Sequence, residues 1–233
     1  VIPGYANFED PAAVTYLLHP LDHKTGLRYS LLPMIHAIIN HMLAPAEALS
    51  HLELIREHLM GPDGARLFDA PMVYRGGPMR IFQRAETATF FGREIGLMYT
   101  HAHIRYAEAL WQYGDAEGFF DAISKVVPTG FMERVASAAA RQSNCYFSSS
   151  DAAFKDRYEA FEDYEKALHG EVMLEGGWRV YSSGAGIASG LILRAFFGVQ
   201  ATCRGLRIDP MLPPGLQGLK VGMDLYGQSF EIE

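Results

Sequence analysis

Two successive runs of residues place apolar side chains three or four positions apart, as one buried face of a helix requires. Their members are Leu32, Ile35, Ile38, Ile39 and Met42 in the first run and Leu49, Leu52, Ile55 and Leu59 in the second. Pro45 separates the two runs, and the sequence GPDG at 61–64 ends the second. This part of the chain is predicted to form a helical hairpin.

Helical periodicity returns further along, whereas the stretch between has none. We expect helices over about 101–112, 116–127, 131–141, 151–168 and 187–197. Residues 65–98 fit no single period, which predicts a long ordered loop, and long loops in compact domains are usually functional. The carboxylates that crowd residues 151–171 are most simply the solvated face of a helix.

The two ends of the chain follow other patterns. Residues 1–30 are rich in proline, glycine, aspartate and histidine without a period, which predicts an irregular connection. Residues 219–226 alternate apolar and polar side chains, and Phe230 with Ile232 repeats the alternation. A β-rich module is therefore expected from about residue 203.

Composition narrows the classes of protein that remain. The 233 residues are 49% hydrophobic, and 20 Lys and Arg against 27 Asp and Glu give a formal charge of −7. Without a concentrated basic face, a nucleic-acid partner is not expected. No apolar run is long enough for a membrane span, and no charged leader with an apolar core is visible. Cys145 and Cys203 suit neither a disulfide scaffold nor a zinc site, so we expect a reducing, cytoplasmic setting.

The first stretch with chemical potential is FGREIGLMYTHAH at 91–103. It places His101 at the expected start of a helix, where free N–H donors and the positive end of the helix dipole favour an anion. A capping or packed histidine is the competing interpretation. His101 and His103 are two positions apart and face different sides of a helix, so they do not predict a metal site.

The second stretch is GGWRVYSSGAG at 176–186. Ser182 and Ser183 offer two adjacent hydroxyls on a segment made permissive by glycines, just before a helix, as a phosphate-wrapping loop requires. The Walker sequence GK[ST] is absent, and so are the GxSxG, HExxH, GxGxxG, DFG and HRD signatures.

These stretches, together with GLRIDPMLPP at 205–214, resemble the inverting β-glucan phosphorylases of family 94 of the glycoside hydrolases. REIG followed by YTH is similar to the family's R/K-E-N-G-G-x-x-x-H stretch. GGWRVYSSGAG is similar to its G-G-W-x-x-Y-T-G-S-A-G loop, and GLRIDP to the run that opens its C-terminal β domain. The resemblance covers about residues 90–215 in the family's order.

The resemblance implies a role for individual residues. His101 would contact phosphate, Ser182 would replace a phosphate-binding threonine, and Ser183 would replace a glycine that donates its backbone N–H. Arg93 and Glu94 would face the sugar acceptor. The family's general acid is an aspartate in a D-W-N-D stretch, which this sequence lacks, so the acid is expected outside this chain.

The implied fold is mainly α: the C-terminal part of an (α/α)6 barrel over residues 1–202, followed by the start of a β domain over 203–233. The chain begins at Val1 and has fewer helices than a closed barrel, so we expect it to join the rest of the same polypeptide. The expected partners are inorganic phosphate, a β-linked gluco-oligosaccharide and a second copy in a homodimer. Neither a metal nor an organic cofactor is implied.

The resemblance implies phosphorolysis of β-glucan oligosaccharides or β-glucosides to α-glucose 1-phosphate with inversion, by a hexosyltransferase-type enzyme. Two alternatives stay open on the residues alone. One is an (α/α)6 hydrolase, which would need a second carboxylate as base for its water. The other is a non-catalytic carbohydrate-binding segment.

Overall fold

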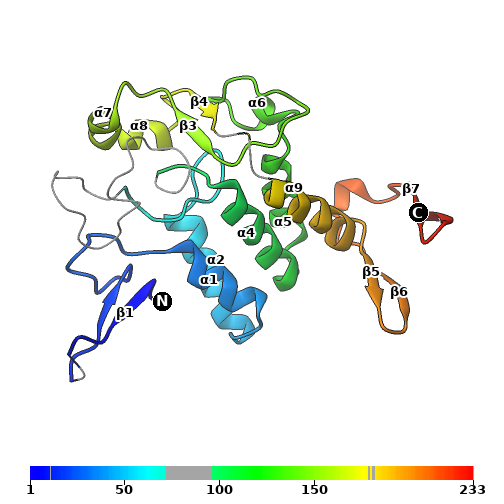
Figure 1. Ribbon diagram of the computed structural model, residues 1–233, viewed down its shortest axis with the longest axis horizontal. Coiled ribbons are helices and arrows are strands. Elements are labelled where there is room, and N and C mark those ends of the chain that lie inside the picture. The colour runs from blue at the N-terminus through cyan, green and yellow to red at the C-terminus, as the bar shows by residue number, and fades with distance from the viewer. Residues whose placement is uncertain (11, 72–95, 178, 180–181, 233) are drawn as a thin grey trace.

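The computed structural model describes residues 1–10, 12–71, 96–177, 179 and 182–232, and its described part is mainly helical (Figure 1). Its helices are α1 (Leu31–Ile39), α2 (Pro45–His58), α4 (Thr100–Tyr113), α5 (Ala116–Val126), α6 (Phe131–Arg134), α7 (Arg157–Glu162), α8 (Tyr164–Leu168) and α9 (Ser182–Leu191), with a π-helical turn η1 (Ile192–Phe196) and a 3-10 turn η2 (Pro214–Leu216). Within this part, no helix is long and apolar enough to cross a bilayer.

The strands form four separate antiparallel pairs. They are β1 (Tyr5–Asn7) with β2 (Thr15–Leu17), β3 (Ser150–Ala152) with β4 (Leu174–Gly176), β5 (Val199–Thr202) with β6 (Gly205–Ile208), and β7 (Val221–Leu225) with β8 (Gln228–Ile232). Three pairs are local hairpins, whereas β3 and β4 join segments more than 20 residues apart. The hairpins at the C-terminal end extend from the helical centre (Figure 1).

The main core lies between α1, α2, α4, α5 and α9. Leu31, Leu52, Leu110 and Phe119 are completely buried there, together with the alanines that let α4 pack closely against its neighbours. Helix α4 ends at Gly114, whose positive φ of 92° suits a left-handed cap. Asp115 then caps α5 by accepting a hydrogen bond from the Gly118 N–H at 2.8 Å. This short connection fixes α4 and α5 side by side.

Several sequence-based expectations for these elements are confirmed. The helical hairpin over residues 31–60 forms as α1 and α2, and the expected helices near 101–112 and 116–127 form as α4 and α5. The period-two pattern near the C-terminal end forms β7 and β8, with Met223 opposite Phe230. Helical periodicity therefore predicted α1, α2, α4 and α5, which contribute much of the main core.

Three expectations were wrong in extent. The helix expected over 131–141 stops at Arg134, because the next residues pair with β4: the Leu174 N–H donates to the Ser137 carbonyl at 2.8 Å, and the Ala139 N–H to the Leu174 carbonyl. The helix expected over 151–168 begins with strand β3, and Asp156 caps α7. The stretch expected to be irregular, 1–30, contains the hairpin β1–β2.

Candidate functional site

The entrance of α4 is held by a short antiparallel pairing with residues 148–150. The Thr100 N–H donates to the Ser148 carbonyl at 3.0 Å, and the Ser150 N–H donates to the Met98 carbonyl at 2.9 Å. Tyr99 precedes the helix in an extended conformation, and its side chain makes no capping hydrogen bond to the first turn. The Thr100 N–H is thus satisfied by the Ser148 carbonyl, and the positive end of the helix dipole remains at the entrance, where it favours an anion.

His101 lies half-buried on this first turn. Its ring stacks on that of Tyr99, with centroids 6.2 Å apart and planes at 18°. Burial lowers the pKa of His101, and the positive charges of Arg105 and His36 lower it further. The lowered pKa favours the neutral imidazole, and a bound anion would raise it again.

His103 has a different, structural environment although it is only two residues away. It is completely buried, its Nδ1 accepts the Ala65 N–H at 3.0 Å, and its Nε2 lies 2.8 Å from the Ala122 carbonyl. These two partners fix the neutral tautomer with the proton on Nε2, and burial lowers the pKa of His103 to about 4. His103 therefore ties the loop before residue 66 to α4 and α5.

Glycines of the stretch 176–186 approach residues 146–150, the segment that includes the residues paired with the α4 entrance. The Gly177 N–H donates to the Ser149 carbonyl at 2.8 Å, and a Cβ added to Gly177 would lie 2.3 Å from Ser149 Oγ. A Cβ on Gly184 would lie 1.9 Å from Tyr146 Oη. Gly177 and Gly184 are thus required for close approach. The α4 entrance and the glycine-rich stretch, which are far apart in sequence, both contact residues 146–150.

Helix α9 begins at Ser182 and packs against α4 (Figure 1). Ser182 is therefore placed at a helix start, but its side chain lies outside the described part of the structure. Ser183 follows with an exposed side chain. Arg93 and Glu94, the residues expected to contact the acceptor sugar, lie outside the described residues.

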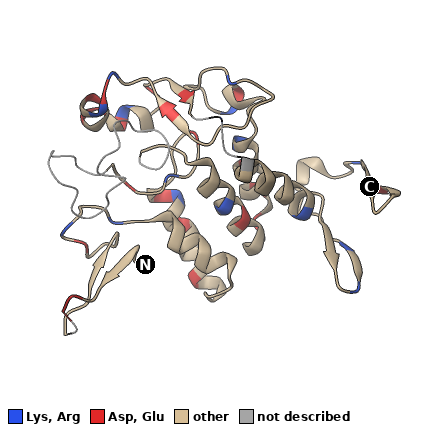
Figure 2. Cartoon of the chain, in the orientation of Figure 1, with Lys and Arg blue, Asp and Glu red and all other residues tan. Residues whose placement is uncertain are grey.

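Two arginines that the sequence analysis did not single out lie beside this segment. Arg141 packs over the Phe131 ring at 3.7 Å and donates from Nη2 to Ser150 Oγ at 2.9 Å. Burial lowers the pKa of Arg141 to about 10, with Asp63 acting in the opposite direction, so the guanidinium stays charged at pH 7. Arg179 lies over the Phe147 ring, with its guanidinium carbon 5.8 Å from the ring centroid. Charges elsewhere are interspersed along the chain (Figure 2).

Two buried hydroxyls at the entrance also escaped the sequence analysis. Thr100 Oγ1 and Ser149 Oγ are inaccessible to solvent and have no hydrogen-bond partner among the described residues. The sequence signal was the run of three serines at 148–150, which falls in a stretch without periodicity. Donors at such positions can orient an oxyanion or the groups that bind it.

A carboxyl pair lies on the strands next to this segment. Asp151 on β3 is directly opposite Glu175 on β4. Burial raises the pKa of Asp151, and the negative charge of Glu175 raises it further. Asp151 therefore keeps its proton to a higher pH than a solvated aspartate does.

The third stretch, GLRIDPMLPP, forms β6 and a docking segment. The Met211 N–H donates to the Ala195 carbonyl in η1 at 2.9 Å, and the Asp209 N–H donates to the Gly198 carbonyl. A Cβ on Gly198 would lie 2.1 Å from the Asp209 backbone, so only glycine permits this contact. These contacts give the stretch a structural role, fastening the β5–β6 hairpin to the helices.

The α4 entrance has a helix start whose N-cap residue makes no capping hydrogen bond and a half-buried imidazole, and two guanidinium groups lie beside the neighbouring segment 146–150. Such a set of donors and positive charge is suited to an anion with several oxygens. Within the described residues, no group of three His, Cys, Asp or Glu side chains could hold a metal ion.

Sequence comparison shows that this chain is similar to part of a phosphorylase. One relative is a 1,2-beta-oligoglucan phosphorylase from Listeria innocua, which is 43% identical over 225 residues. The alignment covers 97% of this chain and 21% of that protein, so the chain spans about a fifth of the length of the curated relative it matches. No family model matches the chain.

Proposed function

We propose that the protein is an inverting glycoside phosphorylase that cleaves β-linked gluco-oligosaccharides, those with 1,2 linkages first, and releases α-glucose 1-phosphate. The observation that carries the proposal is the α4 entrance, where His101 lies on a helix start whose N-cap residue makes no capping hydrogen bond. The relationship to a 1,2-beta-oligoglucan phosphorylase supports the choice of linkage.

In this mechanism, phosphate attacks the anomeric carbon in line while an aspartic acid protonates the departing glycosidic oxygen. Phosphate is already an anionic nucleophile, so no general base is needed, and the protein orients it and balances its charge. His101 takes up a proton as phosphate binds, because a neighbouring anion raises the pKa of an imidazole. Ser182 and Ser183 supply hydroxyl and backbone donors from the start of α9.

The proposal includes the surrounding architecture. The helices belong to an (α/α)6 barrel over residues 1–202, residues 203–233 open a β domain, and the remainder of the polypeptide supplies the general acid. Arg93 and Glu94 contact the acceptor sugar. The enzyme is cytoplasmic and assembles as a homodimer.

One experiment tests the function. The full-length protein is incubated with β-1,2-linked glucose oligosaccharides with and without inorganic phosphate, and the products are analysed by ³¹P NMR. The proposal requires α-glucose 1-phosphate that forms only with phosphate. Release of free sugar at equal rates with and without phosphate would identify a hydrolase, and binding without any product would identify a non-catalytic carbohydrate-binding protein.

A further inference from the structure

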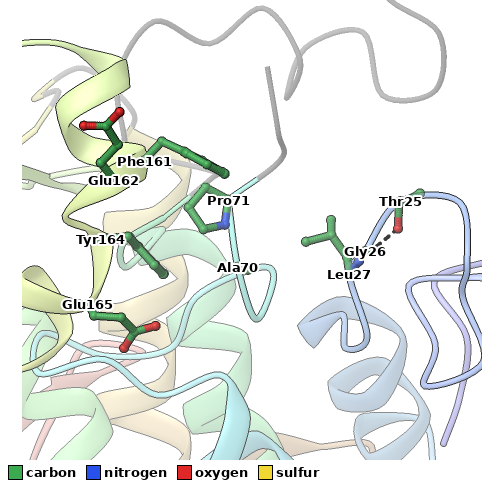
Figure 3. A pocket seen from close by; sticks show the side chains of 9 residues that line it. All are labelled: Thr25, Gly26, Leu27, Ala70, Pro71, Phe161, Glu162, Tyr164 and Glu165. Carbon is green, nitrogen blue, oxygen red and sulfur yellow. Dashed lines mark hydrogen bonds between the residues drawn. The ribbon is translucent and has the colours of Figure 1, made fainter. Parts of the chain in front are cut away.

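A cavity of about 260 Å³ lies between the turn at residues 25–27, the Ala70–Pro71 segment and helices α7 and α8 (Figure 3). Its volume is slightly below the range of about 300–1,000 Å³ typical of small-molecule sites, so it suits a single sugar-sized unit. None of its lining residues belongs to the α4 entrance or to the start of α9.

Aromatic rings form one wall of this cavity. The Tyr164 ring is fixed, because its hydroxyl donates to the Gly96 carbonyl at 2.7 Å and also contacts the Arg66 guanidinium. Phe161 is 45% exposed, and its ring extends toward Pro71 (Figure 3). Leu27 and Pro71 add apolar surface. Tyr164 is only 6% exposed, so it supports the wall, and the accessible Phe161 ring presents the flat, weakly polar surface on which the C–H face of a sugar ring can stack.

One of the two glutamates that line the cavity is directed toward its aromatic wall. The Glu165 side chain extends in the direction of the Tyr164 ring, whereas the Glu162 carboxylate turns away from it (Figure 3). Lys166, the adjacent cation, is paired with Asp163 at 2.9 Å. Within the described part of the chain, Glu165 forms no ion pair, and its carboxylate oxygens can accept hydrogen bonds from ligand hydroxyls.

We propose that this cavity binds one glucosyl unit of a β-1,2-linked glucan, with the sugar ring against Phe161 and its hydroxyls donating to Glu165. The carboxylates disfavour an anionic ligand, and the combination of a ring face with an acceptor favours a neutral, hydroxyl-rich one. The choice of a glucan rests on the proposed function. The cavity is then a second carbohydrate contact, separate from the residues assigned to phosphate.

Hydrogen–deuterium exchange of the full-length protein tests this inference. A β-1,2-linked glucose tetrasaccharide is added without phosphate, and exchange is followed by mass spectrometry in peptides covering 24–28 and 157–168. We expect slower exchange in both regions. Phe161→Ala and Glu165→Gln should each raise the oligosaccharide concentration for half-maximal protection about five- to tenfold.

Two variants serve as matched controls. Glu162→Gln removes the carboxylate that turns away, and Tyr158→Ala removes an aromatic side chain on the same helix that is 61% exposed and does not line the cavity. Both should retain the protection seen in the unaltered protein. Glu165 is exposed, so Glu165→Gln keeps the test valid if Phe161→Ala fails to fold.

The outcomes separate this inference from the proposed function. Absence of protection at 157–168 in a protein that produces glucose 1-phosphate would overturn the inference alone. Protection there in a protein that produces no sugar phosphate would support the cavity and contradict the phosphorylase proposal. Protection by tetramethylammonium chloride but not by the tetrasaccharide would also overturn the inference, because the cavity would then select a cation.

Discussion

The helical layer and segment 146–150, which lies beside the α4 entrance, bury different kinds of groups. Helices α1, α2, α4 and α5 bury aliphatic and aromatic side chains against one another. Segment 146–150 instead has buried serine hydroxyls, the Arg141 guanidinium bonded to Ser150, and close contacts with the backbone of Gly177 and Gly184. The first region gains stability from each buried side chain, whereas the second holds polar groups that cost free energy until they find partners. The difference assigns stability to the helical layer, whereas the second region contains the residues that we propose for binding.

The largest expected effect is a difference in unfolding free energy between substitutions in the two regions. Leu110→Ala removes a completely buried side chain from the helical core and should lower the free energy of unfolding by about 2–5 kcal/mol. Ser149→Ala removes a hydroxyl that has no partner among the described residues, and should change stability by less than about 1 kcal/mol. Urea unfolding of both variants checks this. Equal losses would contradict the division between the regions.

The next prediction concerns the contact where the two regions meet. Gly184→Ala places a Cβ against Tyr146 Oη and should destabilise the protein by about 1–3 kcal/mol, because a well-packed site tolerates no added methyl group. Gly186→Ala is the matched control: it lies in the same helix with open space around it, so it should be neutral or stabilising by up to about 1 kcal/mol. Thermal unfolding of the two variants distinguishes them, and Tyr146→Leu should relieve part of the Gly184→Ala loss.

A smaller effect follows from the buried His103. Burial lowers its pKa to about 4 in the folded protein, whereas in the unfolded chain it titrates near 6.5. Below pH 6.5 the unfolded state therefore binds more protons, and the contribution of His103 to stability is complete above that pH and declines as the pH falls toward 4. Between pH 8 and pH 5 the loss should be about 2 kcal/mol.

Unfolding curves of the unaltered protein and of His103→Gln at both pH values measure this contribution. The variant lacks the titrating ring, so its stability should depend less on pH over this range. An identical pH dependence in the two proteins would show that His103 is not held neutral in the core.

The sequence predicted the core helices because their periodicity agrees with their packing. It failed where pairing between distant segments overrides local preference: residues 135–139 have a helical pattern, but they bond to Leu174 instead. The short strands β1 and β2 were also missed, since three residues are too few to show a period. Local patterns are therefore reliable only where no distant strand competes.

The candidate site was predicted in part. The position of His101 at a helix start follows from sequence, whereas the close approach of Gly177 and Gly184 to residues 146–149 does not. The sequence could not show that residues 146–150 lie between the two stretches, because that depends on the pairing of residues 98–100 with 148–150. Arg141 was missed for the same reason: its proximity to Ser150 arises only from the fold.

The most direct test of the central claim is the affinity for phosphate after loss of the His101 imidazole. Isothermal titration calorimetry of phosphate into the full-length protein with bound oligosaccharide should show binding about 10- to 100-fold weaker in His101→Ala, since one charge-assisted hydrogen bond to the anion is lost. An unchanged phosphate affinity in a correctly folded His101→Ala protein would contradict the account and leave the α4 entrance with a structural role only.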